Sequence, residues 1–123
     1  MRRKKNIRLL LLLAGVCMML ASCKEDPVFD GNLIVGKWVS GTEYYRYDPD
    51  STGATWDTGD DVQESEAQPF TWSFDEKSSR LTLVHQMEMG GVIPKTYTIV
   101  ALDDEVMRYK DNYDQTFEYK RVK

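Results

Sequence analysis

Apolar and polar residues alternate with a period close to two along most of the chain after residue 35. This period is typical of strands that bury one face and expose the other. Beta-branched and aromatic residues are frequent in the alternating stretches, which also favours strands. The pattern predicts strands over residues 36–47, 54–57, 70–74, 81–89, 92–101, 106–110 and 115–122.

Turn-forming residues separate these stretches. The segment 48–53 contains Pro49 and Gly53, and Gly90-Gly91 interrupts the chain after residue 89. The acidic segment 58–68 is predicted to be a mobile loop. Seven or eight short strands joined by turns predict an all-β fold, a small antiparallel up-and-down barrel, because closure removes exposed strand edges.

The first predicted strand carries several aromatic residues. Strict alternation places Trp38, Tyr44 and Arg46 on one face, and Tyr45 and Tyr47 on the other. At least one of these tyrosines therefore faces outward. An outward tyrosine could stack on a carbohydrate ring, contact a partner or simply cover the hairpin surface.

The first 22 residues differ from the rest of the chain. Five basic residues precede an apolar run over residues 9–21. This run is about 13 residues long, whereas a membrane-spanning helix needs roughly 20. A basic start, a short apolar run and small residues at its end are typical of a cleaved secretory signal.

The signal ends in Leu20-Ala21-Ser22-Cys23. This motif resembles the lipobox of bacterial lipoproteins. The resemblance implies that a diacylglyceryl group is added to the Cys23 thiol, that the signal is cut before Cys23, and that the new amino group receives a further acyl chain such as palmitate. Several acyl chains are needed for stable anchoring, so Cys23 would attach the protein to a membrane.

A short charged motif follows the cysteine. Lys24, Glu25 and Asp26 resemble the export tag of Bacteroidetes-type lipoproteins that reach the outer face of the outer membrane. The resemblance implies a lipid-anchored protein of the cell outer membrane that faces the exterior. The alternative is a solvated cluster of linker charges.

These features divide the chain into a signal peptide (1–22), a lipidated tether (23–32) and a barrel domain (33–123). The net charge of the whole chain is −4, and removal of the five basic residues of the signal leaves −9. An acidic domain of this kind argues against nucleic acid as a partner. Cys17 and Cys23 are the chain's two cysteines, so the domain is expected to fold without disulfides.

The barrel domain contains an ordered series of recognisable residues. It resembles the lipocalin-like domains of Bacteroidetes lipoproteins through Gly36-Lys37-Trp38, Asp50-Ser51-Thr52-Gly53 with Trp56, Phe70-Thr71-Trp72-Ser73-Phe74, Tyr97-Thr98-Ile99 with Leu102, and Tyr119-Lys120-Arg121. The resemblance covers about residues 33–123 and implies a small barrel. It also implies that Gly36, Trp38 and Arg121 close one end, with a cation–π contact of the guanidinium on the indole.

Aromatic residues are the candidates for binding. Tyr44, Tyr45, Trp56 and Trp72 are predicted to contact a small hydrophobic or glycan ligand, or a protein partner. The alternative is that the aromatic residues fill the barrel, as side chains do in eight-stranded barrels.

No constellation in the sequence predicts catalysis. Asp48 and Asp50 begin a segment similar to a calcium loop, but Gly59 stands where that loop needs a glutamate. His85 is the only histidine, and we expect it to lie in the core or at the rim, with no metal site. The sequence leaves open whether the acidic loop 57–66 binds a cation. We expect no enzymatic activity and no cofactor.

Two functions follow from these observations. The first is a surface-anchored bacterial lipoprotein with a non-enzymatic, lipocalin-like binding domain. The second is a protein-interaction subunit of an outer-membrane complex, with a filled barrel and no small ligand. An apolar cavity of several hundred cubic ångströms would favour the first, and a packed interior would favour the second.

Overall fold

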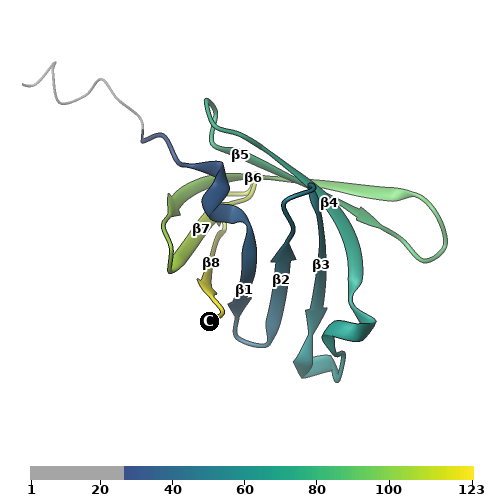
Figure 1. Ribbon diagram of the computed structural model, residues 1–123. Helices are drawn as coiled ribbons and strands as arrows, with labels where there is room; N and C mark the ends of the chain where they lie inside the picture. Colours follow the sequence, from purple (N-terminus) through teal and green to yellow (C-terminus); the bar gives the residue numbers. More distant parts are fainter. Residues whose placement is uncertain (1–26) are drawn as a thin grey trace, which may run out of the picture.

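The computed structural model describes residues 27–123, and these residues form one closed barrel of eight antiparallel strands (Figure 1). The predicted all-β up-and-down barrel is therefore confirmed. The signal peptide, Cys23 and the motif Lys24-Glu25-Asp26 lie outside the described residues. Within residues 27–123, no helix has the length and apolar character needed to cross a membrane.

Each strand pairs with its neighbours in the chain, and the last strand pairs with the first. The elements are η1 (Gly31–Ile34), β1 (Gly36–Ser40), β2 (Glu43–Tyr47), β3 (Thr52–Asp57), η2 (Thr58–Asp60), η3 (Glu64–Glu66), β4 (Gln68–Asp75), β5 (Arg80–Gln86), β6 (Val92–Leu102), β7 (Val106–Lys110) and β8 (Thr116–Arg121). Closure between β1 and β8 rests on a short register, Trp38 opposite Arg121 and Val39 opposite Lys120.

The predicted strand 36–47 is in fact a hairpin of β1 and β2. Gly41 adopts a φ of +61°, which glycine reaches without strain, and the chain reverses at Gly41-Thr42. The reversal pairs Trp38 with Tyr45, so both side chains point into the barrel. The prediction that Trp38 and Tyr45 lie on opposite faces is wrong for this reason.

The predicted strand 81–89 is also too long. β5 ends at Gln86, and Met87 and Met89 lie in the turn of the β5–β6 hairpin. They are exposed, Met89 completely, and do not continue the buried face that Leu81 and Leu83 form. The segment 58–68, predicted to be a mobile loop, contains the short 3-10 helices η2 and η3, and its last residue, Gln68, begins β4.

The interior of the barrel is filled by its own side chains. A single cluster joins apolar and aromatic residues from almost every strand, namely Ile34, Trp38, Tyr45, Tyr47, Phe70, Leu81, Leu83, Ile99, Met107, Tyr109 and Tyr119. Most of these side chains are less than 2 % exposed. Burial of so much apolar area is the main source of stability for a domain of this size, because the described residues contain no cysteine.

Candidate binding surface at the open end of the barrel

One end of the barrel is sealed by η1 and the start of β1. The indole Nε1 of Trp38 donates a hydrogen bond to the Ile34 carbonyl oxygen at 2.9 Å, and the Arg121 guanidinium lies 4.3 Å from the centre of the Trp38 ring. Arg121 also donates to the carbonyl oxygens of Leu33, Val35 and Asp104. These bonds satisfy carbonyl groups that would otherwise be unpaired at the barrel end, so Arg121 closes the barrel as well as stacking on Trp38.

Gly36 makes this arrangement possible. Its φ is +137°, and a Cβ atom at this position would lie 2.3 Å from an Arg121 guanidinium nitrogen. A side chain at residue 36 would therefore displace Arg121 from Trp38. The structure brings together the three residues Gly36, Trp38 and Arg121 that the sequence assigned to closing the barrel.

The opposite end is framed by the β1–β2 turn, the segment 58–67, the β5–β6 hairpin and the β7–β8 turn, and we call it the open end (Figure 1). Three pockets lie there, and the smallest, of about 260 Å³, is lined by η3, the start of β4 and the β5–β6 hairpin. The acidic pocket has a volume of about 460 Å³ and lies where β3 and β4 separate beyond the Thr55–Gln68 pair. The β6 groove, of about 450 Å³, lies between β6 and the β7–β8 turn.

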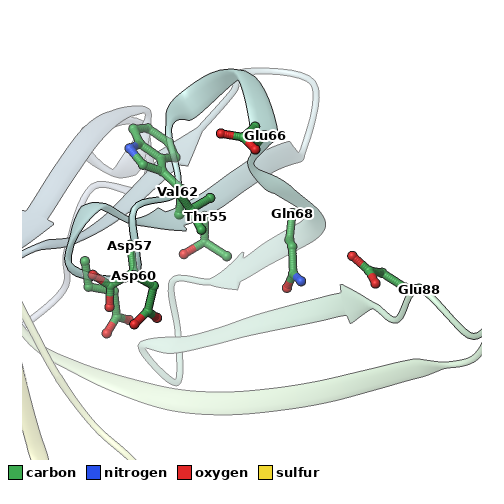
Figure 2. A pocket seen from close by; sticks show the side chains of 9 residues that line it. Thr55, Asp57, Asp60, Val62, Glu66, Gln68 and Glu88 are labelled. Atoms are coloured by element: carbon green, nitrogen blue, oxygen red, sulfur yellow. The ribbon is translucent and has the colours of Figure 1, made fainter.

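Carboxylates dominate the acidic pocket. Its lining comprises Glu43, Asp57, Asp60, Glu66 and Glu88 together with Thr55, Trp56, Val62 and Gln68. Figure 2 shows the Asp57 and Asp60 side chains together on one side of the pocket. Glu66 of η3 and Glu88 of the β5–β6 turn lie apart from them, on other sides of the pocket. No lysine or arginine lines the pocket, so its field repels anions.

Internal hydrogen bonds hold part of this carboxylate set. Asp57 accepts from the Thr42 hydroxyl at 2.7 Å and from the Gly59 amide at 2.8 Å, and these bonds lower the pKa of its carboxyl group. Glu43 accepts from the Tyr119 hydroxyl at 3.4 Å. Among residues 27–123, no three histidine, cysteine or acidic side chains are placed to hold a metal ion.

The segment that resembled the start of a calcium loop is a turn stabilised by its own side chains. The Asp50 carboxylate accepts from the Thr52 amide at 3.1 Å and from the Thr52 hydroxyl at 2.5 Å. Asp48 pairs with Arg46 at 3.2 Å. The carboxylates therefore cap the β2–β3 connection.

The four aromatic residues predicted to contact a ligand are not brought together. Tyr45 points into the core and is 8 % exposed. Trp72 lies near the sealed end, where its indole Nε1 donates to the carbonyl oxygens of Asp48 and Thr52 at 3.2 and 3.0 Å. Tyr44 lies on the outer wall because it alternates with the inward Tyr45, and Trp56 shares that face because it pairs with Tyr44 across β2 and β3.

The outer pair is already covered. The Tyr44 and Trp56 rings stack at a centroid distance of 5.2 Å, and Lys37 Nζ lies 5.6 Å from the Trp56 ring centre. Lys37 and Arg46 both form ion pairs with Glu64 of η3, at 2.7 and 2.9 Å. The indole is 7 % exposed, so little of its surface is free to stack on a sugar.

Four tyrosines belong to the core, namely Tyr45, Tyr47, Tyr109 and Tyr119. Burial raises the pKa of the Tyr45, Tyr47, Tyr109 and Tyr119 phenols above that of a free tyrosine. These phenols are therefore neutral at physiological pH. Within the described part of the chain, the buried hydroxyl of Tyr47 has no hydrogen-bond partner.

The β6 groove was not predicted from the sequence. Tyr97, Phe117 and Tyr113 line it together with Pro94, Lys95, Thr96, Asp111 and Asn112. The exposed tip of the adjacent hairpin carries Met87, Met89, Val92 and Ile93. For the hairpin tip, Gly90-Gly91 was the available signal, because a glycine pair between two alternating stretches is typical of a hairpin turn.

Comparisons of the chain with protein-family models, with curated proteins and with solved structures found no match. The lipocalin-like resemblance thus stays a prediction. The fold defines a closed eight-stranded barrel, and the site defines a polar, solvent-open surface at one end of it.

Proposed function

We propose that this protein is a lipid-anchored bacterial lipoprotein whose lipocalin-like barrel binds a protein partner through its open end. The anchor is the acylated Cys23, the location is the exterior face of the outer membrane, and the domain performs no catalysis. The sequence motifs around Cys23 support the anchor and the location. The barrel fold supports a binding domain of this class.

The filled interior is the observation that carries the binding mode. Trp38, Tyr47, Phe70 and Tyr109 occupy the space in which a larger barrel would enclose a ligand. The open end instead presents three pockets and an apolar hairpin tip to solvent. An arrangement with a filled barrel and an exposed rim favours a protein-interaction subunit over a carrier of an enclosed small molecule.

Site-specific photo-crosslinking on intact cells tests this binding mode. A benzophenone amino acid is placed at Met89 or Tyr113 on the open end, and at Ser78, an exposed residue of the β4–β5 turn at the sealed end, as the matched control. We expect the two open-end positions to give the same adduct and Ser78 to give none. An adduct from Ser78 alone, or no adduct from the open end, would contradict the proposal.

The anchor has its own test. We expect Cys23→Ser to leave the precursor uncleaved or to release the protein from the membrane, because the thiol that carries the diacylglyceryl group is lost. Replacement of Lys24, Glu25 and Asp26 by alanine should keep the protein anchored but protect it from protease added to intact cells. Continued protease sensitivity after that replacement would overturn the surface location.

A small ligand bound at the open end is the alternative function. Its support is the pair of larger pockets, each large enough for a sugar-sized molecule. A thermal-shift screen of residues 24–123 against glycans tests it, with the Glu66→Gln and Glu88→Gln variants as probes of the acidic pocket. A glycan that raises Tm in the wild type and less in these variants would favour this alternative.

A further inference from the structure

Strand β6 runs past the end of its neighbour β7. It covers Val92–Leu102, but its pairing with β7 begins only at Thr98, opposite Lys110. Residues 92–97 therefore pair with β5 on one side and with no strand of the described chain on the other. Figure 1 shows the consequence, since the light green β5–β6 hairpin extends well beyond β7 and β8. This leaves a free strand edge of six residues.

The register shows which main-chain groups lie on this edge. Ile99 N–H donates to the Ser79 carbonyl and Met87 N–H to the Gly91 carbonyl, so the odd residues of β6 bond to β5. In an antiparallel pair, the intervening even residues direct their N–H and C=O groups away from the partner. Val92 and Thr96 therefore present both groups on the free edge. Pro94 presents its carbonyl group alone, because it has no N–H.

The β6 groove lies directly beside this edge. Tyr97, Phe117 and Tyr113 line it, and Tyr113 is 86 % exposed. The groove occupies the place that β7 would fill if it continued alongside β6 instead of ending at Lys110. A strand added there would gain main-chain hydrogen bonds from β6 and aromatic contacts from the groove.

Charge adds a further requirement. Lys95 is exposed and lines the groove, and it forms no ion pair with any residue in the 27–123 range. The neighbouring carboxylate of Asp111 accepts from the Tyr113 and Gln115 amides at 2.9 Å each, so it serves the β7–β8 turn. Asp111 keeps its negative charge but is held by the turn, so on the β6 edge itself the charge without a partner is that of Lys95, and an acidic side chain complements it.

We propose that an extended segment of a partner protein binds by strand addition to the β6 edge, Val92–Tyr97. Its main chain bonds to Val92, Pro94 and Thr96, an apolar side chain enters the β6 groove, and an acidic side chain pairs with Lys95. This inference rests on the proposed function and names the chemistry of the partner.

A second copy of the chain fits this edge less well. Antiparallel pairing of two β6 edges centred on Pro94 would bring two prolines together, each without an N–H donor. Two copies would also bring two exposed lysines, Lys95 of each chain, to the same edge. Proline and lysine on an edge strand both oppose self-pairing. A partner segment without these residues would face only Pro94 of this chain, and no second proline or lysine.

A phage-displayed library of random octapeptides, selected against residues 24–123, provides the probe. The selected peptides are then tested as synthetic peptides against two variants. Thr96→Pro removes the outward N–H of the edge and leaves the β5 pairing intact, since Thr96 does not bond to β5. Thr96→Ala removes the side chain and keeps the N–H, and serves as the matched control.

We expect the selected peptides to contain an acidic residue and alternating apolar residues. Thr96→Pro should weaken their binding about tenfold, the effect of one lost main-chain hydrogen bond with its unpaired partner, and Thr96→Ala should change it less than about twofold. N-methylation of alternate residues of the peptide should abolish binding to the wild-type protein. This second measurement needs no protein variant, so it holds even if Thr96→Pro fails to fold.

Three results would overturn the inference. The first is that no selected peptide binds with a Kd below about 100 µM, a range in which weak peptide recognition is measurable. The second is that a peptide binds the wild type and a folded Thr96→Pro variant equally well. The third is that the N-methylated peptide binds the wild type as well as the unmodified peptide does. Self-association that Thr96→Pro removes would assign the edge to a second copy instead. If one of these three results is obtained but the crosslinks at Met89 persist, the open end remains the binding surface and only strand addition is excluded.

Discussion

Arg121 shows how one side chain can connect distant parts of a small barrel. Its guanidinium stacks on Trp38 and donates to carbonyl groups of η1, of the residue before β1 and of the β6–β7 turn. Lysine has the charge but not the planar fork of donors, so it cannot make all of these bonds at once.

We therefore expect Arg121→Met to lower the free energy of unfolding by about 2 kcal/mol, since the cation–π contact is lost and two partly buried carbonyl groups lose their donor. Arg121→Lys should cost roughly half as much. Urea denaturation monitored by tryptophan fluorescence measures both variants. Equal stability of the Met variant and the wild type would show that Arg121 does not close the barrel.

His85 predicts a dependence of stability on pH. Burial is the main cause that lowers its pKa below 6.5, and the nearby charge of Lys95 lowers it further. The unfolded chain therefore binds a proton more readily than the folded one. The contribution of neutral His85 to the free energy of unfolding is fully present above pH 6.5. It is lost as the pH falls through the lower pKa that His85 has in the folded state.

The measurement compares urea midpoints of the wild type and His85→Gln at several values between about pH 5 and 7.5, the range in which histidine titrates. The wild type should lose more stability than the variant as the pH falls. Because both proteins share every carboxylate, the difference between them isolates His85. Parallel curves would contradict the lowered pKa.

At the scale of the elements, close approach of β2, β3 and β4 depends on Gly53. A Cβ atom at Gly53 would lie 2.3 Å from the Arg46 carbonyl oxygen and 2.5 Å from the Phe70 ring. Both neighbours are held in place, the carbonyl by the β2–β3 ladder and the ring by the core. The missing side chain therefore lets Phe70 pack against the β3 backbone.

We expect Gly53→Ala to destabilise the protein by about 3 kcal/mol through overpacking. Gly41→Ala is the control, because nothing lies within 4 Å of a Cβ there. It should cost only about 1 kcal/mol, the strain of a non-glycine residue at positive φ. Thermal unfolding of both variants checks the order, and a larger loss for Gly41→Ala would refute the packing argument.

Alternation of apolar residues was sufficient to predict most strands, because the barrel buries one face of each. It failed where a turn is too short to interrupt the pattern. Gly41-Thr42 reverses the chain in two residues, so the alternation continues across it with the faces exchanged. It also failed at Met87 and Met89, which extend the apolar pattern of β5 into an exposed turn.

The closing residues were easier to predict than the binding surface. Trp38 and Arg121 belong to a local motif at each end of the domain, and the register of β1 with β8 brings them together. The acidic pocket and the β6 groove instead depend on strand lengths. The pairing of β3 with β4 ends at Thr55 and Gln68, and β7 is too short to pair with the first half of β6. Alternation alone does not reveal either difference in strand length.

At the scale of the whole molecule, the barrel is closed but its neighbouring strands differ in length. Only two residue pairs join β1 to β8, and the barrel can close through so few pairs because one core connects almost all of its strands. The unequal lengths place the unpaired main-chain groups of β6 and the exposed apolar side chains of the β5–β6 hairpin at the open end. The sealed end, which η1 covers, contains the hydrogen bonds of Trp38 and Arg121 that close the barrel.

The filled interior leads to a prediction for hydrophobic ligands. We expect palmitate and other long-chain fatty acids to leave the Tm of residues 24–123 unchanged, because Leu83, Phe70 and Tyr109 already occupy the core. Leu83→Ala should lower stability by about 3 kcal/mol and leave an apolar cavity. Benzene should then raise the Tm of this variant but not that of the wild type, since dry apolar cavities of this kind bind small aromatics. Saturable binding of palmitate by the wild-type protein would instead mean that the barrel opens to enclose a ligand, and would return the function to a lipid carrier.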